Sequence, residues 1–217
     1  MVIACWSVKG GSGTSVVAAS LALILAERSQ PPGALLVDLA GDAAAVLGLA
    51  EPATGVREWL AAGDTAPADS LARLEVDAAP NLRLLPSGAI APPTTAARGE
   101  VLAALLGDDP RPVVIDAGIL SGEVALTVAA SATVSLLVVR PCYLALRRAV
   151  SAPLRPSGVV LVGEVGRALG RADVEAVLGV PVRAEVMVDP AVARAVDAGV
   201  LASRLPKPLA RALRHAA

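Results

Sequence analysis

The residues best suited to chemistry form a glycine-rich segment from Lys9 to Ser15, with the sequence Lys-Gly-Gly-Ser-Gly-Thr-Ser. An apolar run, residues 2–8, precedes it, and a helix-like run begins at Ser15. A glycine-rich turn between a strand and a helix directs backbone N–H groups at an anion, so this pattern predicts a phosphate site. The usual phosphate loop ends in Gly-Lys-Ser/Thr, and its lysine contacts the β- and γ-phosphates. Thr14 occupies the position of that lysine in this chain.

Two carboxylates end apolar, strand-like runs further along the chain. Asp38 follows Leu-Leu-Val, and Asp116 follows Val-Val-Ile. An aspartate at the end of such a strand can hold Mg²⁺ beside bound phosphates, directly or through a water molecule. A structural alternative stays open for both residues, because either could simply cap its strand or the following turn. Asp42 lies a few residues beyond Asp38 and is a third candidate.

The elements that must position these residues alternate along the whole chain. The apolar runs are continuous rather than alternating, which indicates strands that are covered on both faces. Strand–helix alternation predicts an α/β fold in three layers: a mostly parallel, twisted sheet of about seven strands with helices on both faces. We expect one domain, residues 1–217, with ligands at the carboxyl ends of the strands. The predicted strands are 2–8, 34–38, 82–86, 113–116, 133–139, 159–162 and 182–186, and the predicted helices are 15–28, 43–49, 56–62, 94–106, 123–130, 144–151, 171–178, 191–198 and 209–215.

The glycine-rich segment resembles the deviant phosphate loop (P-loop) of the ParA/MinD family of dimeric ATPases. The family pattern is K-G-G-x-G-K-[ST], and this chain matches it except at Thr14. In that family the early lysine crosses the dimer interface and contacts the nucleotide of the partner. The resemblance implies a P-loop NTPase fold, ATP and Mg²⁺ as ligands, and a homodimer in which Lys9 reaches the opposite site. It also implies that Ser15, Asp38 and Asp116 surround the metal.

Later landmarks follow in the order that the family has them. Asn81–Gly88 resembles its third strand, and Val139-Arg140-Pro141 resembles the step after its fifth strand. Residues 187–190 resemble a loop that lies near the adenine in relatives. The plain alternative is a turn into a helix with proline at its first position. The nucleotide-binding residues that the resemblance implies are Lys9, Gly10, Gly11, Ser12, Gly13, Thr14, Ser15, Met187, Val188, Asp189 and Pro190.

Two departures from the family pattern concern catalysis. Thr14 removes the cation that offsets phosphate charge, and Ala40 stands where the family has the aspartate that positions the attacking water. Electrostatic stabilisation and water positioning are the main contributions of a protein to phosphoryl transfer. We therefore expect a degenerate ParA/MinD-like protein, a dimeric positioning adaptor with weak or no ATP hydrolysis, similar to the TadZ/CpaE-like proteins that position secretion or pilus machinery. An active ATPase that uses Lys9 in trans and Asp42 in place of the missing carboxylate, in partitioning or division, stays open as the alternative.

Charge and composition narrow the possible partners. With 19 basic and 20 acidic residues the net charge is −1, which disfavours nucleic acid as a partner and leaves a protein of positioning, secretion or division machinery. Arg140, Arg147 and Arg148 form either a local basic patch or a solvated helix face. The two cysteines have no metal-ligand partners nearby in sequence, which indicates reduced thiols in a cytoplasmic protein.

A membrane role is disfavoured by the length of the apolar segments. Mean hydropathy is +0.65, but the longest run without charge or proline, residues 124–139, is too short to span a bilayer. Leu205, Leu209 and Leu213 recur at helical spacing near the C-terminus. We expect them to dock a short helix on the domain rather than to contact a membrane.

Overall fold

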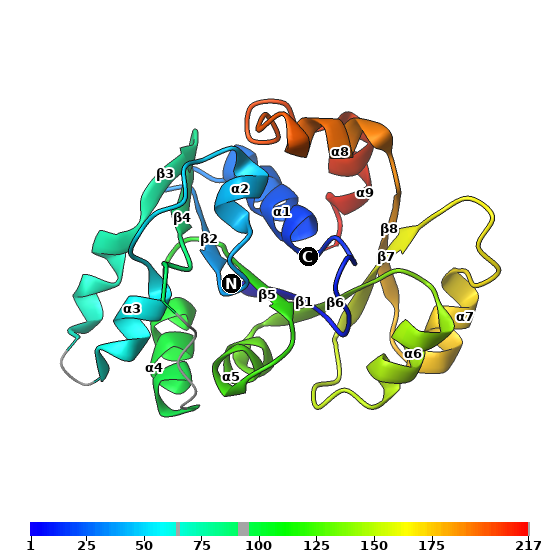
Figure 1. Ribbon diagram of the computed structural model, residues 1–217, viewed down its shortest axis with the longest axis horizontal. Coiled ribbons are helices and arrows are strands. Elements are labelled where there is room, and N and C mark those ends of the chain that lie inside the picture. The colour runs from blue at the N-terminus through cyan, green and yellow to red at the C-terminus, as the bar shows by residue number, and fades with distance from the viewer. Residues whose placement is uncertain (64–65, 91–95, 217) are drawn as a thin grey trace.

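The computed structural model describes residues 1–63, 66–90 and 96–216 and has three layers, with a sheet between two sets of helices (Figure 1). The eight-stranded sheet has the order β3-β4-β2-β5-β1-β6-β7-β8. All neighbouring strands are parallel except β3 and β4. The predicted α/β architecture is confirmed. The strands are β1 Val2–Ser7, β2 Ala34–Asp38, β3 Val76–Ala79, β4 Leu82–Leu85, β5 Val113–Ile119, β6 Val134–Val139, β7 Gly158–Gly163 and β8 Val182–Met187.

The helices divide between the two faces of the sheet. One face is covered by α1 Thr14–Arg28, α2 Ala43–Leu47, α8 Pro190–Asp197 and α9 Lys207–Leu213 (Figure 1). The other is covered by α3 Val56–Ala61, α4 Ala96–Gly107, α5 Glu123–Ser131, α6 Tyr143–Val150 and α7 Arg171–Leu178. The short 3₁₀ helices Ala68–Ser70 and Ala72–Leu74 precede β3.

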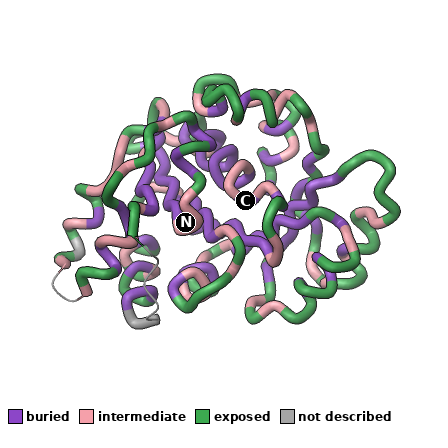
Figure 2. The backbone as a smooth tube through the Cα atoms, in the orientation of Figure 1, coloured by how far each residue is buried: buried purple, intermediate pink, exposed green. Residues whose placement is uncertain are grey.

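Both faces of the central strands are buried, which explains their continuous hydrophobicity. Successive side chains of a strand point to opposite faces, so β1 sends Ile3 and Cys5 into one core and Ala4 and Trp6 into the other. Figure 2 shows the strands as buried throughout their central parts, whereas the outer sides of the helices are exposed. The sheet is therefore a rigid platform from which loops project at its edges.

The sheet has one strand more than the sequence predicted. β3 is a four-residue edge strand, Val-Asp-Ala-Ala, that pairs antiparallel with β4. Aspartate and alanine have low strand propensity, so pairing with β4 rather than local preference decides its structure. The helix predicted at residues 94–106 begins at Ala96 in the structure, because residues 94 and 95 lie outside the described part of the chain.

The C-terminal helix docks on the domain as predicted. Leu209 and Leu213 are buried in the core that α1 and α9 share. In the part of the chain that the structure describes, no helix combines the length and apolar character needed to cross a membrane. Cys5 and Cys142 are both free thiols, with Cys5 fully buried and Cys142 half-buried.

Candidate functional site

The glycine-rich loop connects β1 to α1 in the conformation expected of an anion-binding turn. Gly11 has φ 73° and Gly13 has φ 85°, in the left-handed region that favours glycine. Gly13 caps α1, which begins at Thr14, so the first N–H groups of the helix have no acceptor within it. The Ser12 hydroxyl donates to the carbonyl oxygen of Lys9 at 2.8 Å and closes the loop. The loop thus directs the positive end of a 15-residue helix outwards.

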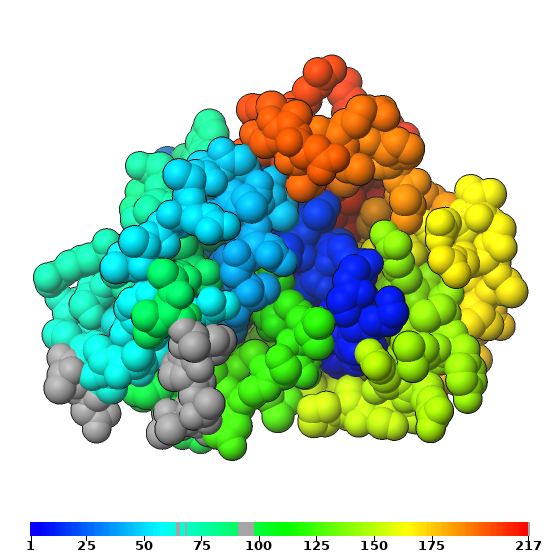
Figure 3. Space-filling view, viewed as in Figure 1, coloured from blue at the N-terminus to red at the C-terminus, as the bar shows by residue number. Residues whose placement is uncertain are grey.

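The loop lines a cavity of about 530 Å³ together with α2 and the turn after β5. Figure 3 shows the loop, in dark blue, at the surface of the viewed face, below α8 in orange. The exposed Asp42 also lines this cavity, as the sequence predicted for a residue near the phosphates. Thr14 is 6% exposed, so the residue in place of the lysine is largely covered. Lys9 is half-buried, and within the described residues its ammonium group forms no ion pair.

The strand order brings the two predicted carboxylates together at the carboxyl edge of the sheet. β5 lies between β1 and β2, and the register pairs Asp116 with Asp38 on one side and with Cys5 on the other. Both aspartates are buried, at 0% and 1% exposure respectively. Burial, followed by repulsion between the charges, opposes ionisation of such a pair.

Asp116 has a carboxylate oxygen without a hydrogen-bond donor. Its Oδ1 accepts the N–H of Gly118 at 3.0 Å, whereas Oδ2 is buried and has no partner of hydrogen-bond geometry among the described residues. Burial raises the pKa of Asp116 to about 7, and the Asp38 charge adds to this effect, while the nearby Ser15 hydroxyl and the Gly118 N–H favour the ionised form. A buried, unsatisfied oxygen beside Ser15 at the end of a phosphate-type loop fits a cation or a water bound to one.

Asp38 is engaged by the backbone of the following turn. Its Oδ1 accepts the N–H of Gly41 at 2.6 Å, and its Oδ2 accepts the N–H of Ala43 at 3.0 Å. Burial raises the pKa of Asp38, and these two donors partly offset that effect. The Asp38 side chain therefore shapes the turn between β2 and α2, and this turn carries Asp42. Each carboxylate oxygen still has a further lone pair that can accept from a metal-bound water.

A second, apolar cavity of about 230 Å³ adjoins the loop. Its walls include Met187, Val188 and Asp189, and it shares Gly13, Val16 and Val196 with the larger cavity. Pro190 is the first residue of α8, and the Asp189 carboxylate caps that helix by accepting the N–H of Ala191 at 2.8 Å. The segment is thus a capped strand-to-helix turn and also the wall of an apolar space beside the loop, so both interpretations of its sequence are compatible with the geometry.

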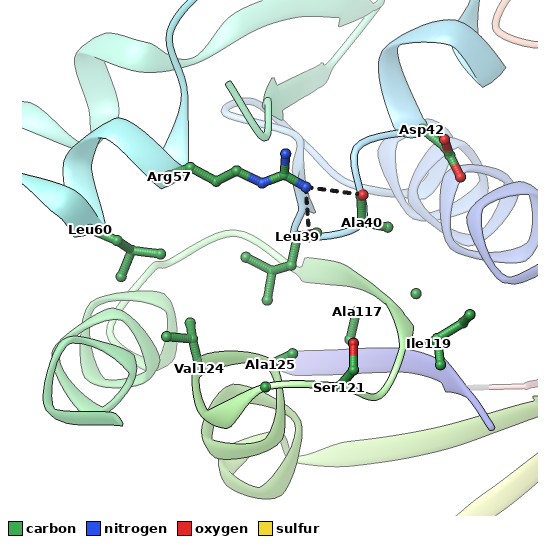
Figure 4. Close-up of a pocket in the computed structure, with 12 residues that line it drawn as sticks. Leu39, Ala40, Asp42, Arg57, Leu60, Ala117, Ile119, Ser121, Val124 and Ala125 are labelled. Carbon is green, nitrogen blue, oxygen red and sulfur yellow. Dashed lines mark hydrogen bonds between the residues drawn. The ribbon is translucent and has the colours of Figure 1, made fainter. Parts of the chain in front are cut away.

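The sequence analysis missed Arg57, which holds the turn after β2 (Figure 4). Arg57 on α3 donates from Nη2 to the carbonyl oxygens of Ala40 at 3.1 Å and Leu39 at 3.5 Å. It also lines a third cavity of about 330 Å³ that opens beside Ala40, between the turns after β2 and β5. The Ala40 methyl lies against Gly118, where an added Cβ would be only 2.8 Å away. No local sequence signal predicts the Arg57 contacts, because they join separate elements.

The solved structures to which this chain is similar include a ParA family ATPase and MinD proteins. The ParA family ATPase from Chlorobium tepidum TLS superposes with a TM-score of 0.80 and 21% identity, over 98% of this chain and 95% of that chain. MinD from Pyrococcus horikoshii OT3, complexed with Mg-ADP, gives a TM-score of 0.75 and 22% identity over 99% and 93%. Pyrococcus furiosus MinD gives 0.75 and 24% over 99% and 95%. The chain has the ParA/MinD fold.

Among the comparisons with known proteins, the one between structures finds this similarity. No protein-family profile matches the chain, and no curated protein matches it. Within the fold, Asp38 and Asp116 are paired across β2 and β5, and Asp42 lines the loop cavity. The described residues contain no group of three His, Cys, Asp or Glu side chains that could hold a metal by themselves. Of the predicted basic patch, Arg140 lines the apolar cavity, while Arg147 and Arg148 are exposed on α6 and do not line it.

Proposed function

We propose that the chain is a nucleotide-binding protein that acts as a dimeric positioning adaptor in the cytoplasm, with weak or no ATP hydrolysis. The observation that carries the proposal is a phosphate-type loop whose Ser15 lies near the buried Asp116, an aspartate with an Oδ2 that has no hydrogen-bond partner among the described residues. The site also lacks the lysine and the second aspartate of the resembled family. Thr14 supplies no cation to the phosphates, and Ala40 supplies no carboxylate to a water. Binding by backbone N–H groups survives such losses better than catalysis does.

The residues of the site fit a nucleotide with Mg²⁺. The loop and the first turn of α1 would hold the phosphates, and the adjoining apolar cavity, bounded by residues 187–189, would take the base. Ser15 and Asp116 would hold the metal, and Asp38 would contact a water bound to it. Mg²⁺ commonly takes only one or two protein carboxylates and completes its shell with phosphate and water, so a large acidic cluster is unnecessary. The metal would neutralise phosphate charge and the charge of Asp116.

The dimer would place the two loops face to face. Lys9 is half-buried, is followed by two glycines and pairs with no carboxylate in the described chain, so its ammonium group is available to a partner. We expect a concentration-dependent dimer that Mg-ATP tightens and that Lys9→Ala weakens without loss of the fold. Truncating one charged partner at an interface typically costs about 2–5 kcal/mol.

The test combines three measurements on one preparation. Binding of fluorescent ATP with Mg²⁺ is expected, phosphate release is expected to be very slow, and sedimentation should show a dimer that Lys9→Ala weakens. Asp116→Ala should weaken the Mg²⁺-dependent part of nucleotide binding. Absence of nucleotide binding would overturn the proposal, and so would a monomer at every concentration. Multiple-turnover hydrolysis at an ordinary ATPase rate, abolished by Asp116→Ala, would overturn the adaptor interpretation.

An active ATPase is the second candidate, and the position of Asp42 favours it. The Asp42 carboxylate is exposed and lines both the loop cavity and the cavity beside Ala40. It could therefore orient a water from a position two residues beyond the family's aspartate, with Lys9 acting in trans. This candidate predicts that Asp42→Ala abolishes measurable turnover while nucleotide binding persists. If the wild-type protein shows no turnover, only the adaptor proposal remains.

A further inference from the structure

The outward face of α6 is an unusual surface, because it combines exposed apolar side chains with unpaired arginines. We name the α6 surface after the five outward residues of that helix: Tyr143, Leu144, Arg147, Arg148 and Val150. Tyr143 is the only tyrosine of the chain and is 75% exposed, and Val150 is 63% exposed. The opposite side of the helix packs into the core, so these side chains face solvent by the geometry of the helix.

Charge on this part of the chain has one sign. Residues 124–163 contain four arginines and neither aspartate nor glutamate. Within the described residues none of the four forms an ion pair, and Arg155 only donates to the Gly179 carbonyl oxygen at 3.2 Å. The acidic residues of α7 contact groups of their own helix or its cap: Asp173 accepts the N–H of Gly170, and Glu175 pairs with Arg171. The surface therefore carries arginines that have no ion-pair partner in the described part of the chain.

A hollow of mixed polar and apolar lining continues this surface. A cavity of about 380 Å³ lies between the end of α6, the loop at residues 152–156 and the end of α7. Val150 is on its rim, and so is Val177, which is 49% exposed. Figure 1 shows α6 and α7 together at one end of the molecule, far from α3 and β3. Tyrosine and arginine beside exposed apolar side chains are the composition enriched in protein interfaces.

We propose that the α6 surface and the adjoining hollow bind an acidic, partly apolar segment of a partner protein. The arginines would pair with aspartate or glutamate side chains, and apolar anchors between those acids would contact Tyr143 and fill the hollow beside Val150. The proposal deepens the proposed function by naming how an adaptor holds its partner. The biological role of the α6 surface rests on the proposed adaptor function. Binding at the α6 surface can be tested separately, because this surface does not include the nucleotide site.

Other occupants fit the surface less well. A nucleic acid would leave the exposed apolar side chains and the hollow unused, and four arginines give only a few phosphate contacts. A membrane requires a helix that can lay its apolar face into the lipid, but the apolar face of α6, with Leu146, is already buried in the core.

The first experiment locates a partner at the α6 surface in living cells of the natural source. Tyr143→p-benzoylphenylalanine would be cross-linked by light, and the adduct digested and sequenced. The matched control is Val101→p-benzoylphenylalanine, since Val101 is also an exposed apolar residue but lies on α4. The expected result is a protein adduct at position 143 alone, through a segment in which acidic and apolar residues alternate. No adduct, the same adduct at both positions, or a segment without acids would overturn the proposal.

The second experiment measures binding of that segment, made as a labelled peptide, by fluorescence anisotropy. Arg147→Glu/Arg148→Glu is expected to weaken binding by about tenfold or more, because two attractions become repulsions. Arg204→Glu/Arg211→Glu changes two exposed, unpaired arginines elsewhere by the same charge and should alter affinity by less than about twofold. Equal loss in both variants would overturn the proposal. Tighter binding to phosphatidylglycerol vesicles or to duplex DNA, lost with Arg147 and Arg148, would also overturn it.

The same variants separate this inference from the proposed function. Titration of each with Mg-ATP should give wild-type affinity, because neither arginine lines the loop cavity. Loss of peptide binding with intact nucleotide binding supports the α6 surface as a separate site. Nucleotide binding without any peptide binding would refute only the α6 surface, whereas peptide binding without nucleotide binding would refute only the proposed nucleotide site.

Discussion

Thr14→Lys is expected to strengthen nucleotide binding. Thr14 is the first residue of α1 and lines the loop cavity of about 530 Å³, so a lysine can extend into space that already exists. The glycines on either side of Ser12 already hold the backbone in its left-handed turns. The substitution therefore adds a cation to a prepared loop rather than rebuilding the loop.

The magnitude follows from two opposing effects. A charge-assisted contact between an ammonium group and phosphate contributes about 1.5–3 kcal/mol. Without ligand, the same ammonium group lies at the positive end of the α1 dipole, which costs about 0.3–1 kcal/mol and should lower the unfolding free energy of the ligand-free protein. Bound phosphate reverses that repulsion. We expect nucleotide affinity to rise about tenfold to a hundredfold while the melting temperature of the ligand-free protein falls slightly.

The assay is titration of labelled ATP with Mg²⁺, monitored by fluorescence, on wild type and on two variants. Thr14→Met has a side chain of comparable length without the charge, and is the control for filling the cavity. Equal gains in the lysine and methionine variants would show that charge is not the cause. Unchanged affinity in Thr14→Lys would refute the reasoning, because a loop that ignores a restored lysine does not hold phosphate.

Three further predictions concern hydrolysis, pH and the backbone. Ala40→Asp in the Thr14→Lys background is expected to increase phosphate release, and an unchanged rate would mean that the carboxylate is not the missing part. Asp116→Asn is expected to stabilise the ligand-free protein increasingly as pH rises from about 4 to 7. Because the pKa of Asp116 is raised in the folded protein, ionising this residue destabilises the fold, and asparagine cannot ionise. The gain in the free energy of unfolding approaches roughly 4 kcal/mol. Urea unfolding at pH 5 and pH 8 would measure it, and a gap independent of pH would contradict the assignment. Gly33→Ala is expected to cost about 3 kcal/mol or more in thermal unfolding, because its φ is 83° and a Cβ would lie 2.0 Å from a backbone oxygen of the β3–β4 turn; a wild-type melting temperature would refute this.

Local sequence patterns predicted most of the helices and strands and the glycine-rich loop. Continuous apolar runs indicated strands buried on both faces, because a side chain on either face of β1 must meet a helix layer. The glycine-rich segment indicated a turn between a strand and a helix, which the structure has. The C-terminal helix, predicted at residues 209–215, is Lys207–Leu213 in the structure. Each of these signals depends on neighbours within a few residues, so the chain itself displays them.

The edge strand β3 is an element that local sequence patterns do not predict. β3 contains one valine, one aspartate and two alanines, a composition that predicts no strand. It becomes a strand because the turn at Asn81 returns the chain alongside β4, whose backbone groups need partners. Strand propensity is low in this segment, and pairing with β4 decides that it forms a strand.

The candidate site divides in the same way between sequence and tertiary structure. The sequence by itself determined that a glycine-rich loop opens a helix, that Asp38 ends a strand, and that Thr14 and Ala40 stand where the resembled family has a lysine and an aspartate. The prediction that Asp116 ends its strand was wrong, because β5 continues to Ile119 in its pairing with β1. Only the tertiary structure decided that β5 lies between β1 and β2, which opposes the two aspartates and leaves Asp116 Oδ2 unsatisfied. It also decided that Arg57 holds the turn at Ala40. The physical reason is that strand order and contacts between helices and turns depend on packing between segments distant in sequence, which no short window of residues encodes.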